Sequence, residues 1–364
     1  MAVENGKAKY YILMEELKNA ILSGKIKPGE KLPSENELSL KYSISRHTVR
    51  KALSILTNEG YIIAEHGKGT YCSERLKNHS ASKNIAVVTT YISDYIFPRL
   101  IKGIDNVLTA NGYSIILKNT GNSRKNEARC LDDIMTKNID GLIIEPSKSD
   151  IYCKNINQYN NLDQLGIPYV FIQGTYQSLK DKPSILMDDM EGSYMLTKYL
   201  IELGHKSIVG IFKVDDSQGV LRHKGYVKAL NEAGFPYDPD KVIWFHTEDR
   251  DIKPKESIKD IILSKVQIDG IVCYNDQIAY EVIRELQDMN KKVPEDISVT
   301  GYDDSMIASN GPIKLTTIAH PKEKLGEMAA ELLLEKIHGI DDNESKVARL
   351  IEPQMIIRES CMKR

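Results

Sequence analysis

The nine residues that begin at Ser45 read SRHTVRKAL, and the first domain of the chain is organised around them. The Ser45 hydroxyl can accept a backbone N–H two or three residues on, so Ser45 is expected to cap a helix. Val49 and Leu53 recur at helical spacing and are predicted to face a core. Arg46 and Arg50 stand four residues apart and therefore project from one face. The pattern fits a recognition helix that carries bidentate donors into the major groove of DNA. It also fits an ordinary amphipathic surface helix whose arginines are solvated.

Helix and hairpin patterns surround this stretch. Four apolar residues upstream have the period of a helix with one buried face: Tyr10, Met14, Leu17 and Ile21. Ser34 and Glu37 have the spacing of a capping box, which predicts a second helix ending near residue 41. Two β-prone runs, at 61–64 and 69–71, flank a glycine-bearing loop and predict a hairpin. Three helices and a hairpin predict a winged helix-turn-helix domain over residues 1–74.

This region resembles the DNA-binding domain of the GntR family of bacterial repressors. The matching stretches are residues 24–35 (GKIKPGEKLPSE), 45–53, 60–61 (GY) and 67–71 (GKGTY). The resemblance implies that the recognition helix enters the major groove and that the wing tip reaches the minor groove. The residues that it places at DNA are Lys9, Tyr10, Glu35, Asn36, Ser45, Arg46, His47, Thr48, Arg50, His66, Gly67 and Lys68.

Chemistry supports the two arginines and leaves the role of Glu35 open. An Arg side chain can bind guanine O6 and N7 together, with about 1–3 kcal/mol of discrimination. The Glu35 carboxylate could accept from cytosine N4. It could also simply favour the positive N-terminus of the second helix.

Charge and cysteine content place the chain in a broad class. Residues 1–79 hold 13 Lys and Arg against 9 Asp and Glu, whereas the remainder holds 36 against 42. A basic head on an acidic body suits a protein whose head meets a polyanion. The five cysteines are widely spaced, without a zinc or redox pattern, and predict reduced thiols. The chain shows no secretory signal and no membrane-length apolar run, so we expect a cytoplasmic protein.

The pattern of the sequence changes after a polar linker at residues 75–84. Continuous apolar strands then alternate with amphipathic helices, which predicts doubly wound parallel sheets. The strands are expected at 85–90, 114–117, 141–145, 168–172, 207–212, 242–245, 270–274, 297–302 and 315–318. These strands are too many for one compact unit, so residues 85–364 should form two α/β lobes. The expected lobes are about 85–173 plus 318–340, and about 187–315 plus 348–364. A ligand would bind between them, at the carboxyl ends of the strands.

The body resembles the sugar-binding domain of LacI/GalR repressors, which has a type I periplasmic-binding-protein fold. The matching segments include Asp140–Ile144, Arg222–Tyr226, Tyr274–Ala279 and Gly301–Asp304. A GntR-type head on such a body is similar to the arabinose-repressor family of Gram-positive bacteria. Residues 89–98, 145–148 and 210–213 look closer to that family than to other LacI members, which implies L-arabinose as the effector.

The chemistry of sugar binding selects candidates among the residues that follow strands. Vicinal hydroxyls pair with carboxylates, amides and Arg, and an aromatic ring can cover the C–H face. The candidates are Tyr91, Asp94, Tyr95, Phe97, Glu145, Lys148, Asp216, Gln218, Arg222, Asn275, Asp276, Asp303 and His320. The resemblance makes Arg222, Asn275 and Asp303 the firmest of these. Asp276 could instead be a helix N-cap, and the aromatic residues could belong to the core.

Together, these observations predict a homodimeric repressor that binds palindromic operator DNA and is released by a sugar. Two carboxylates beside a sugar also occur in glycosidases, but the DNA-binding head argues against catalysis. The chain has no P-loop, no GxSxG, and no GxGxxG after the first strand of the body. We therefore expect no enzymatic activity, no metal and no cofactor. A hexose, a nucleoside or a purine could replace arabinose, and a sugar-binding module whose head contacts protein is the alternative from another class.

Overall fold

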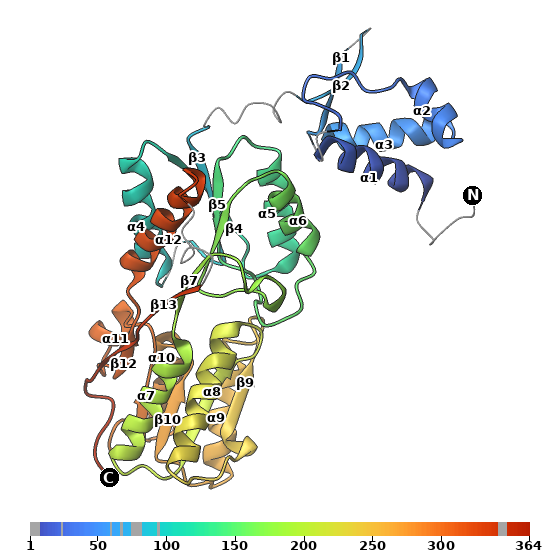
Figure 1. Cartoon of the computed structure of the whole chain (residues 1–364). Coiled ribbons are helices and arrows are strands. Elements are labelled where there is room, and N and C mark those ends of the chain that lie inside the picture. Colours follow the sequence, from blue (N-terminus) through green and yellow to red (C-terminus); the bar gives the residue numbers. More distant parts are fainter. Residues whose placement is uncertain are drawn as a thin grey trace.

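The structure is a computed structural model that describes residues 8–22, 25–58, 60–65, 68–73, 82–92, 95–340 and 348–364. It consists of a small N-terminal head and a larger body of two α/β lobes (Figure 1). The head and the two parallel sheets confirm the predicted fold class.

The head contains three helices and an antiparallel hairpin. Its elements are α1 (Lys9–Leu22), α2 (Glu35–Tyr42), α3 (Arg46–Asn58), β1 (Ile62–Glu65) and β2 (Gly69–Cys72). Val49, Leu53 and Leu56 of α3 are buried in the core of the head, as their spacing predicts. The capping box also forms, because the Ser34 hydroxyl accepts from the Glu37 N–H and the Glu37 carboxylate accepts from the Ser34 N–H.

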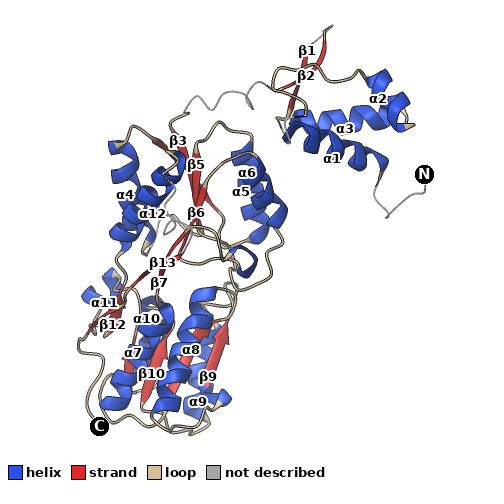
Figure 2. Ribbon diagram, viewed as in Figure 1, coloured by secondary structure: helices blue, strands red, loops and turns tan. Residues whose placement is uncertain are grey.

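The first lobe is built on a six-stranded parallel sheet in the order β13-β7-β6-β5-β3-β4. Its strands are β3 (Asn84–Thr89), β4 (Ser114–Asn119), β5 (Gly141–Ile144), β6 (Tyr169–Ile172), β7 (Ser184–Met187) and β13 (Ala348–Ile351). Helices α4 (Phe97–Ala110) and α12 (Lys322–Ile337) cover one face, and α5 (Arg124–Met135) and α6 (Ile156–Gln164) cover the other (Figure 2). Both faces of the sheet are therefore buried, and this explains the continuous apolar strands.

The second lobe has a four-stranded parallel sheet in the order β11-β10-β8-β9. Its strands are β8 (Ile208–Lys213), β9 (Val242–Phe245), β10 (Gly270–Cys273) and β11 (Ser298–Thr300). Helices α7 (Asp189–Glu202) and α8 (Ser217–Glu232) pack on one face, and α9 (Lys253–Leu263) and α10 (Asp276–Asp288) pack on the other. A short helix, α11 (Met306–Asn310), contacts α10.

Three chain segments connect the lobes. The chain crosses between β7 and α7, between β12 (Thr317–Ala319) and α12, and between β13 and β14 (Gln354–Ile356). Strands β12 and β14 pair antiparallel with each other at this junction. The lobes are thus joined by three crossing segments, and a connection of this kind permits hinge closure around a ligand.

One lobe boundary differs from the sequence prediction. Residues 348–364 were expected to lie wholly in the second lobe, but residues 348–351 form β13 in the first sheet, where they pair with β7. Strand β7 itself was not predicted. Both strands lie next to a segment that crosses between the lobes. The sheet that each strand joins depends on a pairing partner that is distant in sequence.

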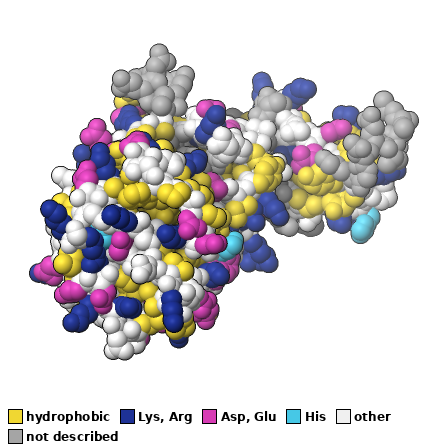
Figure 3. Space-filling model, turned by 90° about the horizontal axis from the view of Figure 1, so that it is seen from below, with side chains coloured by type: hydrophobic (Ala, Val, Ile, Leu, Met, Phe, Trp, Pro, Cys, Tyr) yellow, Lys and Arg dark blue, Asp and Glu magenta, His cyan; other side chains and the backbone are white. Residues whose placement is uncertain are grey.

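The start of the body is held to the first lobe by one carboxylate. Asp140 accepts hydrogen bonds from the Ser82 backbone N–H and hydroxyl, both at 2.7 Å, and from the Lys83 N–H at 3.0 Å. Lys, Arg, Asp and Glu side chains are mixed over the visible face of the body (Figure 3). None of the described helices is long and apolar enough to cross a membrane.

Helices α7 and α8 pack so closely that a glycine is required between them. A Cβ atom at Gly225 would lie 2.0 Å from the Met190 carbonyl oxygen and 2.7 Å from the Tyr194 backbone nitrogen. We predict that Gly225→Ala lowers the free energy of unfolding of this lobe by about 3 kcal/mol, because backbone atoms must move apart. Urea denaturation measures the stability of this lobe when it is followed by the fluorescence of Trp244, the single tryptophan, which lies in β9. Lys224→Ala, at the preceding exposed position, is the control, and an unchanged midpoint for Gly225→Ala would contradict the close packing.

Candidate functional site

The face of α3 that the sequence analysis assigns to DNA is exposed to solvent. Ser45 caps α3, because its Oγ accepts from the Thr48 N–H at 3.2 Å and lies 2.8 Å from the Thr48 hydroxyl oxygen. Arg46, His47 and Arg50 are exposed on the same helix. The opposite face is buried in the head core. An anchored helix that exposes Arg46 and Arg50 on one face can enter a DNA groove.

Glu35 has a role that neither sequence interpretation foresaw. Its two carboxylate oxygens accept from Arg50 Nε at 3.0 and 2.8 Å. The pair joins the start of α2 to the exposed face of α3. Exposed ion pairs contribute little stability, so its structural effect is to orient the guanidinium.

The other predicted DNA contacts differ in exposure. Lys9 and Asn36 are exposed, whereas Tyr10 is half-buried with the Lys51 ammonium 3.9 Å from its ring centroid. Lys68 is exposed near the hairpin turn and pairs with Glu65 at 3.2 Å. His66 and Gly67 lie outside the described residues.

A cavity of about 230 Å³ lies between the two lobes of the body. Strand ends of both lobes supply its lining, as expected for the crevice of a doubly wound sheet. The predicted residues that border it are Tyr91, Tyr95, Phe97, Glu145, Asp216, Gln218, Arg222, Asn275 and Asp303. Residues far apart in sequence are therefore brought to one site.

Arg222 is the central cation of the cavity, although only 2% of its surface is exposed. Its Nε donates to Asp189 Oδ1 at 2.8 Å, and Nη2 lies 3.6 Å from Asp303 Oδ1. Its guanidinium carbon lies 3.6 Å from the centroid of the Tyr302 ring. Burial alone would lower the pKa of Arg222, but the two carboxylates hold it well above its ordinary value. The guanidinium is therefore a permanent, fixed donor.

Asp303 lies beside this guanidinium and is held in place by a tyrosine of the first lobe. The Tyr95 hydroxyl donates to Asp303 Oδ2 at 2.7 Å, so an aromatic residue of the first lobe reaches the second. Both residues have left-handed backbones, with φ of +63° at Tyr95 and +96° at Asp303. Such conformations are costly for non-glycine residues and concentrate at ligand sites.

A second charged cluster occupies the other part of the cavity. Lys213 Nζ lies 2.9 Å from Asp216 Oδ2, and the Tyr274 hydroxyl donates to the same oxygen at 2.8 Å. Burial alone would lower the pKa of Lys213, but Asp216 and Asp215 raise it above its ordinary value. Asp216 also caps α8 by accepting from the Gly219 N–H at 2.8 Å.

Glu145 is a buried carboxyl whose pKa is raised. Its Oε2 accepts from the Thr90 N–H at 2.8 Å and from the Thr90 hydroxyl at 2.6 Å. Burial raises the pKa of Glu145 to about 7, although these hydrogen bonds and Lys213 lower it in part. Near neutral pH the group can therefore donate or accept a proton in a hydrogen bond to a ligand.

Aromatic rings form a further wall of the cavity. The rings of Tyr91 and Phe97 lie 5.8 Å apart, and the Arg250 guanidinium lies 5.2 Å from the Tyr91 centroid. Phe245 and Tyr274 contribute from the second lobe. These rings can cover the apolar face of a sugar.

Three predicted ligand residues do not border the cavity, and a fourth is not described. Asp276 accepts from the Ser305 N–H and the Thr317 hydroxyl, both at 2.7 Å, so it ties α10 to β12. The N-cap of α10 is Asn275 instead. His320 is buried beside Gln173, and burial lowers its pKa to about 4. Lys148 forms ion pairs with the second lobe. Asp94 lies outside the described residues.

The lining also contains residues that the sequence analysis missed, among them Asn122, Gln173, Lys213, Arg250 and Tyr274. Tyr274 directly precedes Asn275, and Lys213 ends the strand before Asp216, so strand-end position was an available signal for both. Gln173 also follows a predicted strand, and its amide nitrogen is buried without a hydrogen-bond partner. Arg250 follows a longer loop, which gave no positional signal.

The charges that border the cavity nearly balance. The cations are Lys213, Arg222, Arg250 and Lys255, and the acids are Glu145, Asp216, Asp251, Glu281 and Asp303. Within the described part of the chain, no cluster of His, Cys, Asp and Glu suits a metal ion. A balanced set of donors and acceptors is suited to an uncharged, hydroxyl-rich ligand.

Two family descriptions match this architecture. Residues 9–72 match the gntR family of bacterial regulatory proteins, and residues 197–361 match a periplasmic binding protein-like domain. Among solved structures, a periplasmic binding protein/LacI transcriptional regulator from Alkaliphilus metalliredigens QYMF, complexed with D-xylulofuranose, has a TM-score of 0.67. It is 26% identical, and the match covers 77% of this chain and 100% of that one.

Two relatives that match over nearly their whole length specify the class of protein further. An arabinose metabolism transcriptional repressor from Halalkalibacterium halodurans is 42% identical over 97% of this chain and 96% of its own length. One of the same description from Geobacillus stearothermophilus is 38% identical over 97% of both chains. The fold and these matches define a transcriptional repressor, a class of protein without enzymatic activity. The chain belongs to the family of arabinose metabolism transcriptional repressors.

The raised pKa of Glu145 predicts a pH-dependent stability difference. The folded pKa of about 7 exceeds the ordinary value of 4.5, so the fold favours the protonated carboxyl, and stability is lost as pH rises through this window. Gln cannot ionise, and its oxygen can still accept from Thr90. We expect Glu145→Gln to raise the melting temperature relative to wild type at pH 8, with a smaller gain at pH 5. Thermal denaturation without sugar tests this, and an equal difference at both pH values would refute it.

Proposed function

We propose that this protein is a homodimeric repressor that binds palindromic operator DNA and is released by L-arabinose, thereby controlling arabinose utilisation genes. The observation that carries the proposal is the composition of the cavity. Its polar groups come from both lobes, with the Tyr95 hydroxyl and the Glu145 carboxyl from the first and Arg222 and Asp303 from the second. An effector bound there would contact both lobes and favour their closure.

Arabinose fits the chemistry of this cavity. It is an uncharged pentose whose hydroxyls can each donate and accept a hydrogen bond. The ion pairs around Arg222 and Lys213 offer both donors and acceptors to such hydroxyls. The aromatic side chains offer a surface for its C–H face. The relatives from Halalkalibacterium halodurans and Geobacillus stearothermophilus are arabinose metabolism transcriptional repressors, which supports the same choice.

The head would supply the second half of the mechanism. A dimer would place two α3 helices in successive major grooves of a palindrome, about one helical turn apart. Arg46 and Arg50 would contact base edges or phosphates. Sugar-driven closure of the lobes would change the separation of the heads and weaken binding to the operator.

A second sugar is the alternative that a comparison favours. The regulator from Alkaliphilus metalliredigens is complexed with D-xylulofuranose, so a protein of this fold binds a five-carbon ketose. A thermal-shift panel of pentoses, hexoses, nucleosides and purines separates these candidates. A ligand present at 100 times its Kd adds about 2.7 kcal/mol of stability.

We predict that L-arabinose weakens operator affinity by roughly 5- to 150-fold, the usual range of allosteric coupling. Fluorescence anisotropy of the full-length protein measures this, on a palindrome obtained by in vitro selection. Arg50→Ala should lose operator affinity about tenfold or more and keep sugar binding. Arg129→Ala, an exposed arginine of α5, is the matched control. If no pentose changes operator affinity, the arabinose assignment fails.

Asp303→Asn tests the cavity itself. Asn tolerates the left-handed backbone at this position, and Arg222 keeps its bond to Asp189. We expect arabinose affinity to fall about tenfold or more, because a hydrogen bond to a charged group is lost. Operator affinity without sugar should stay unchanged. Isothermal titration calorimetry and anisotropy measure the two affinities, and a wild-type sugar Kd would remove Asp303 from the site.

A further inference from the structure

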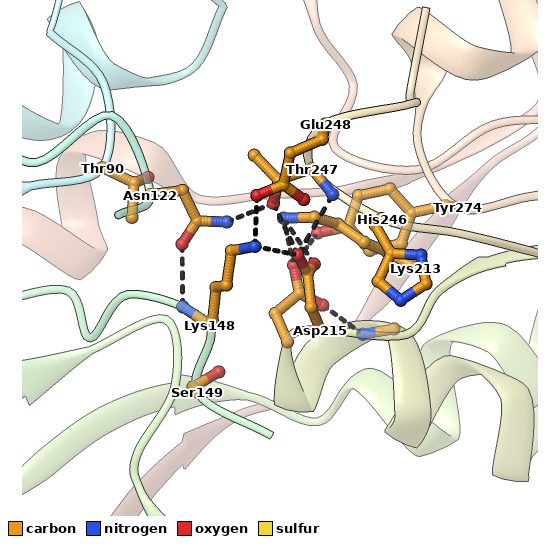
Figure 4. A network of polar contacts seen from close by, with 12 residues as sticks. Thr90, Asn122, Lys148, Ser149, Lys213, Asp215, His246, Thr247, Glu248 and Tyr274 are labelled. Carbon is orange, nitrogen blue, oxygen red and sulfur yellow. Dashed lines mark hydrogen bonds and ion pairs between the residues drawn. The ribbon is translucent and has the colours of Figure 1, made fainter. Parts of the chain in front are cut away.

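A network of ion pairs and hydrogen bonds beside the cavity connects the two lobes (Figure 4). Lys148 lies in the loop after β5 of the first lobe and points toward the second. Its Nζ lies 3.4 Å from Asp215 Oδ2 and also pairs closely with the Glu248 carboxylate. Asp215 follows β8 and Glu248 follows β9, so both ion pairs join different lobes.

Asn122 fixes this network from the first lobe. Its Oδ1 accepts from the Lys148 backbone N–H at 2.8 Å, and its Nδ2 donates to the Thr247 hydroxyl at 2.7 Å. Asn122 is buried, and Lys148 has a left-handed backbone with φ of +52°. The lysine is thus held in one orientation by a residue that itself reaches across the gap.

Asp215 links the network to the cavity. Its carboxylate is fully buried and accepts from the Thr247 N–H at 3.1 Å and hydroxyl at 2.9 Å. Oδ2 faces Lys148, whereas Oδ1 lies 3.5 Å from Nζ of Lys213, which borders the cavity. One buried carboxylate is therefore shared by a lysine of the cavity and a lysine of the opposite lobe.

We propose that Asn122, Lys148, Asp215, Thr247 and Glu248 form an interlobe clamp that stabilises lobe closure and positions Lys213 toward the effector. The inference rests on the proposed function, since the effector is expected between the lobes. Lys148 does not border the cavity and acts as a positioning residue. Because apparent affinity scales with the fraction of protein in the competent state, loss of the Lys148 ion pairs weakens sugar binding without loss of a sugar contact.

The clamp also predicts a salt effect on the binding of an uncharged sugar. Arabinose carries no charge, so ions act on its affinity chiefly through charge pairs that form when the lobes close. Glu248 is 67% exposed on its side chain and is open to screening, whereas Lys148 is 16% exposed and Asp215 is fully buried. The wild-type Kd for arabinose should therefore rise with salt, and the Kd of a variant without Lys148 should not.

The test uses the full-length protein and L-arabinose. We expect Lys148→Met to raise the Kd by about tenfold, if removal of the clamp lowers the closed fraction tenfold. Lys148→Arg should recover most of the affinity, and Glu248→Gln should have a smaller effect because that pair is exposed. Lys182→Met removes an ion pair with Asp163 inside the first lobe and is the matched control. Calorimetry at low and high salt gives the affinities, and small-angle X-ray scattering without sugar gives the radius of gyration, which should increase for Lys148→Met alone.

Two results would overturn the clamp. One is a wild-type Kd with unchanged salt dependence for Lys148→Met. The other is an unchanged radius of gyration for that variant. If Lys148→Met misfolds, circular dichroism reveals it, and the exposed Glu248→Gln variant then decides by its salt dependence. If wild-type protein binds no arabinose, the proposed function fails, and the scattering comparison still decides whether the clamp holds the lobes.

Discussion

The body depends on one buried cation, the guanidinium of Arg222. A charge removed from water is tolerated only when oppositely charged partners surround it. The partners of Arg222 are Asp189, at the first crossing between the lobes, and Asp303, at the end of β11. The ring of Tyr302 lies against its face. The Arg222 side chain thus joins the segment at the hinge to the segment at the cavity. A change in the position of Arg222 would therefore affect both the hinge and the cavity.

Several cavity residues have a structural role and face the site as well. Asp216 caps α8 and also pairs with Lys213. Asn275 caps α10 and also borders the cavity. A residue that caps a helix can therefore also border the cavity, so capping does not by itself rule out a place in the site. Asp276 differs, because its carboxylate is consumed by contacts to Ser305 and Thr317. Position after a strand therefore identifies candidates, and only the contacts of each side chain assign its role.

In the proposed mechanism, closure of the lobes connects the cavity to the rest of the protein. A ligand shifts a conformational equilibrium only by its differential affinity for the two states. In the proposed mechanism, the cavity provides such a difference because its polar side chains come from both lobes. The clamp around Lys148 contributes to the free energy of closure without contacting the ligand, since its ion pairs join the lobes directly. Affinity for the effector and the energy of closure can therefore be tuned at separate residues.

The sequence by itself determined the head, the two-lobed fold class and most of the cavity candidates. Helical period, capping box and strand ends are local, and the 3.6-residue and strand patterns report which faces are buried. Tertiary structure alone decided the contacts between lobes. It placed Lys148 at Asp215 and Glu248, turned His320 toward Gln173, and paired Glu35 with Arg50. It also assigned β13 to the first sheet. These outcomes depend on where distant loops and strands meet, and local propensity carries no information about such long-range pairings.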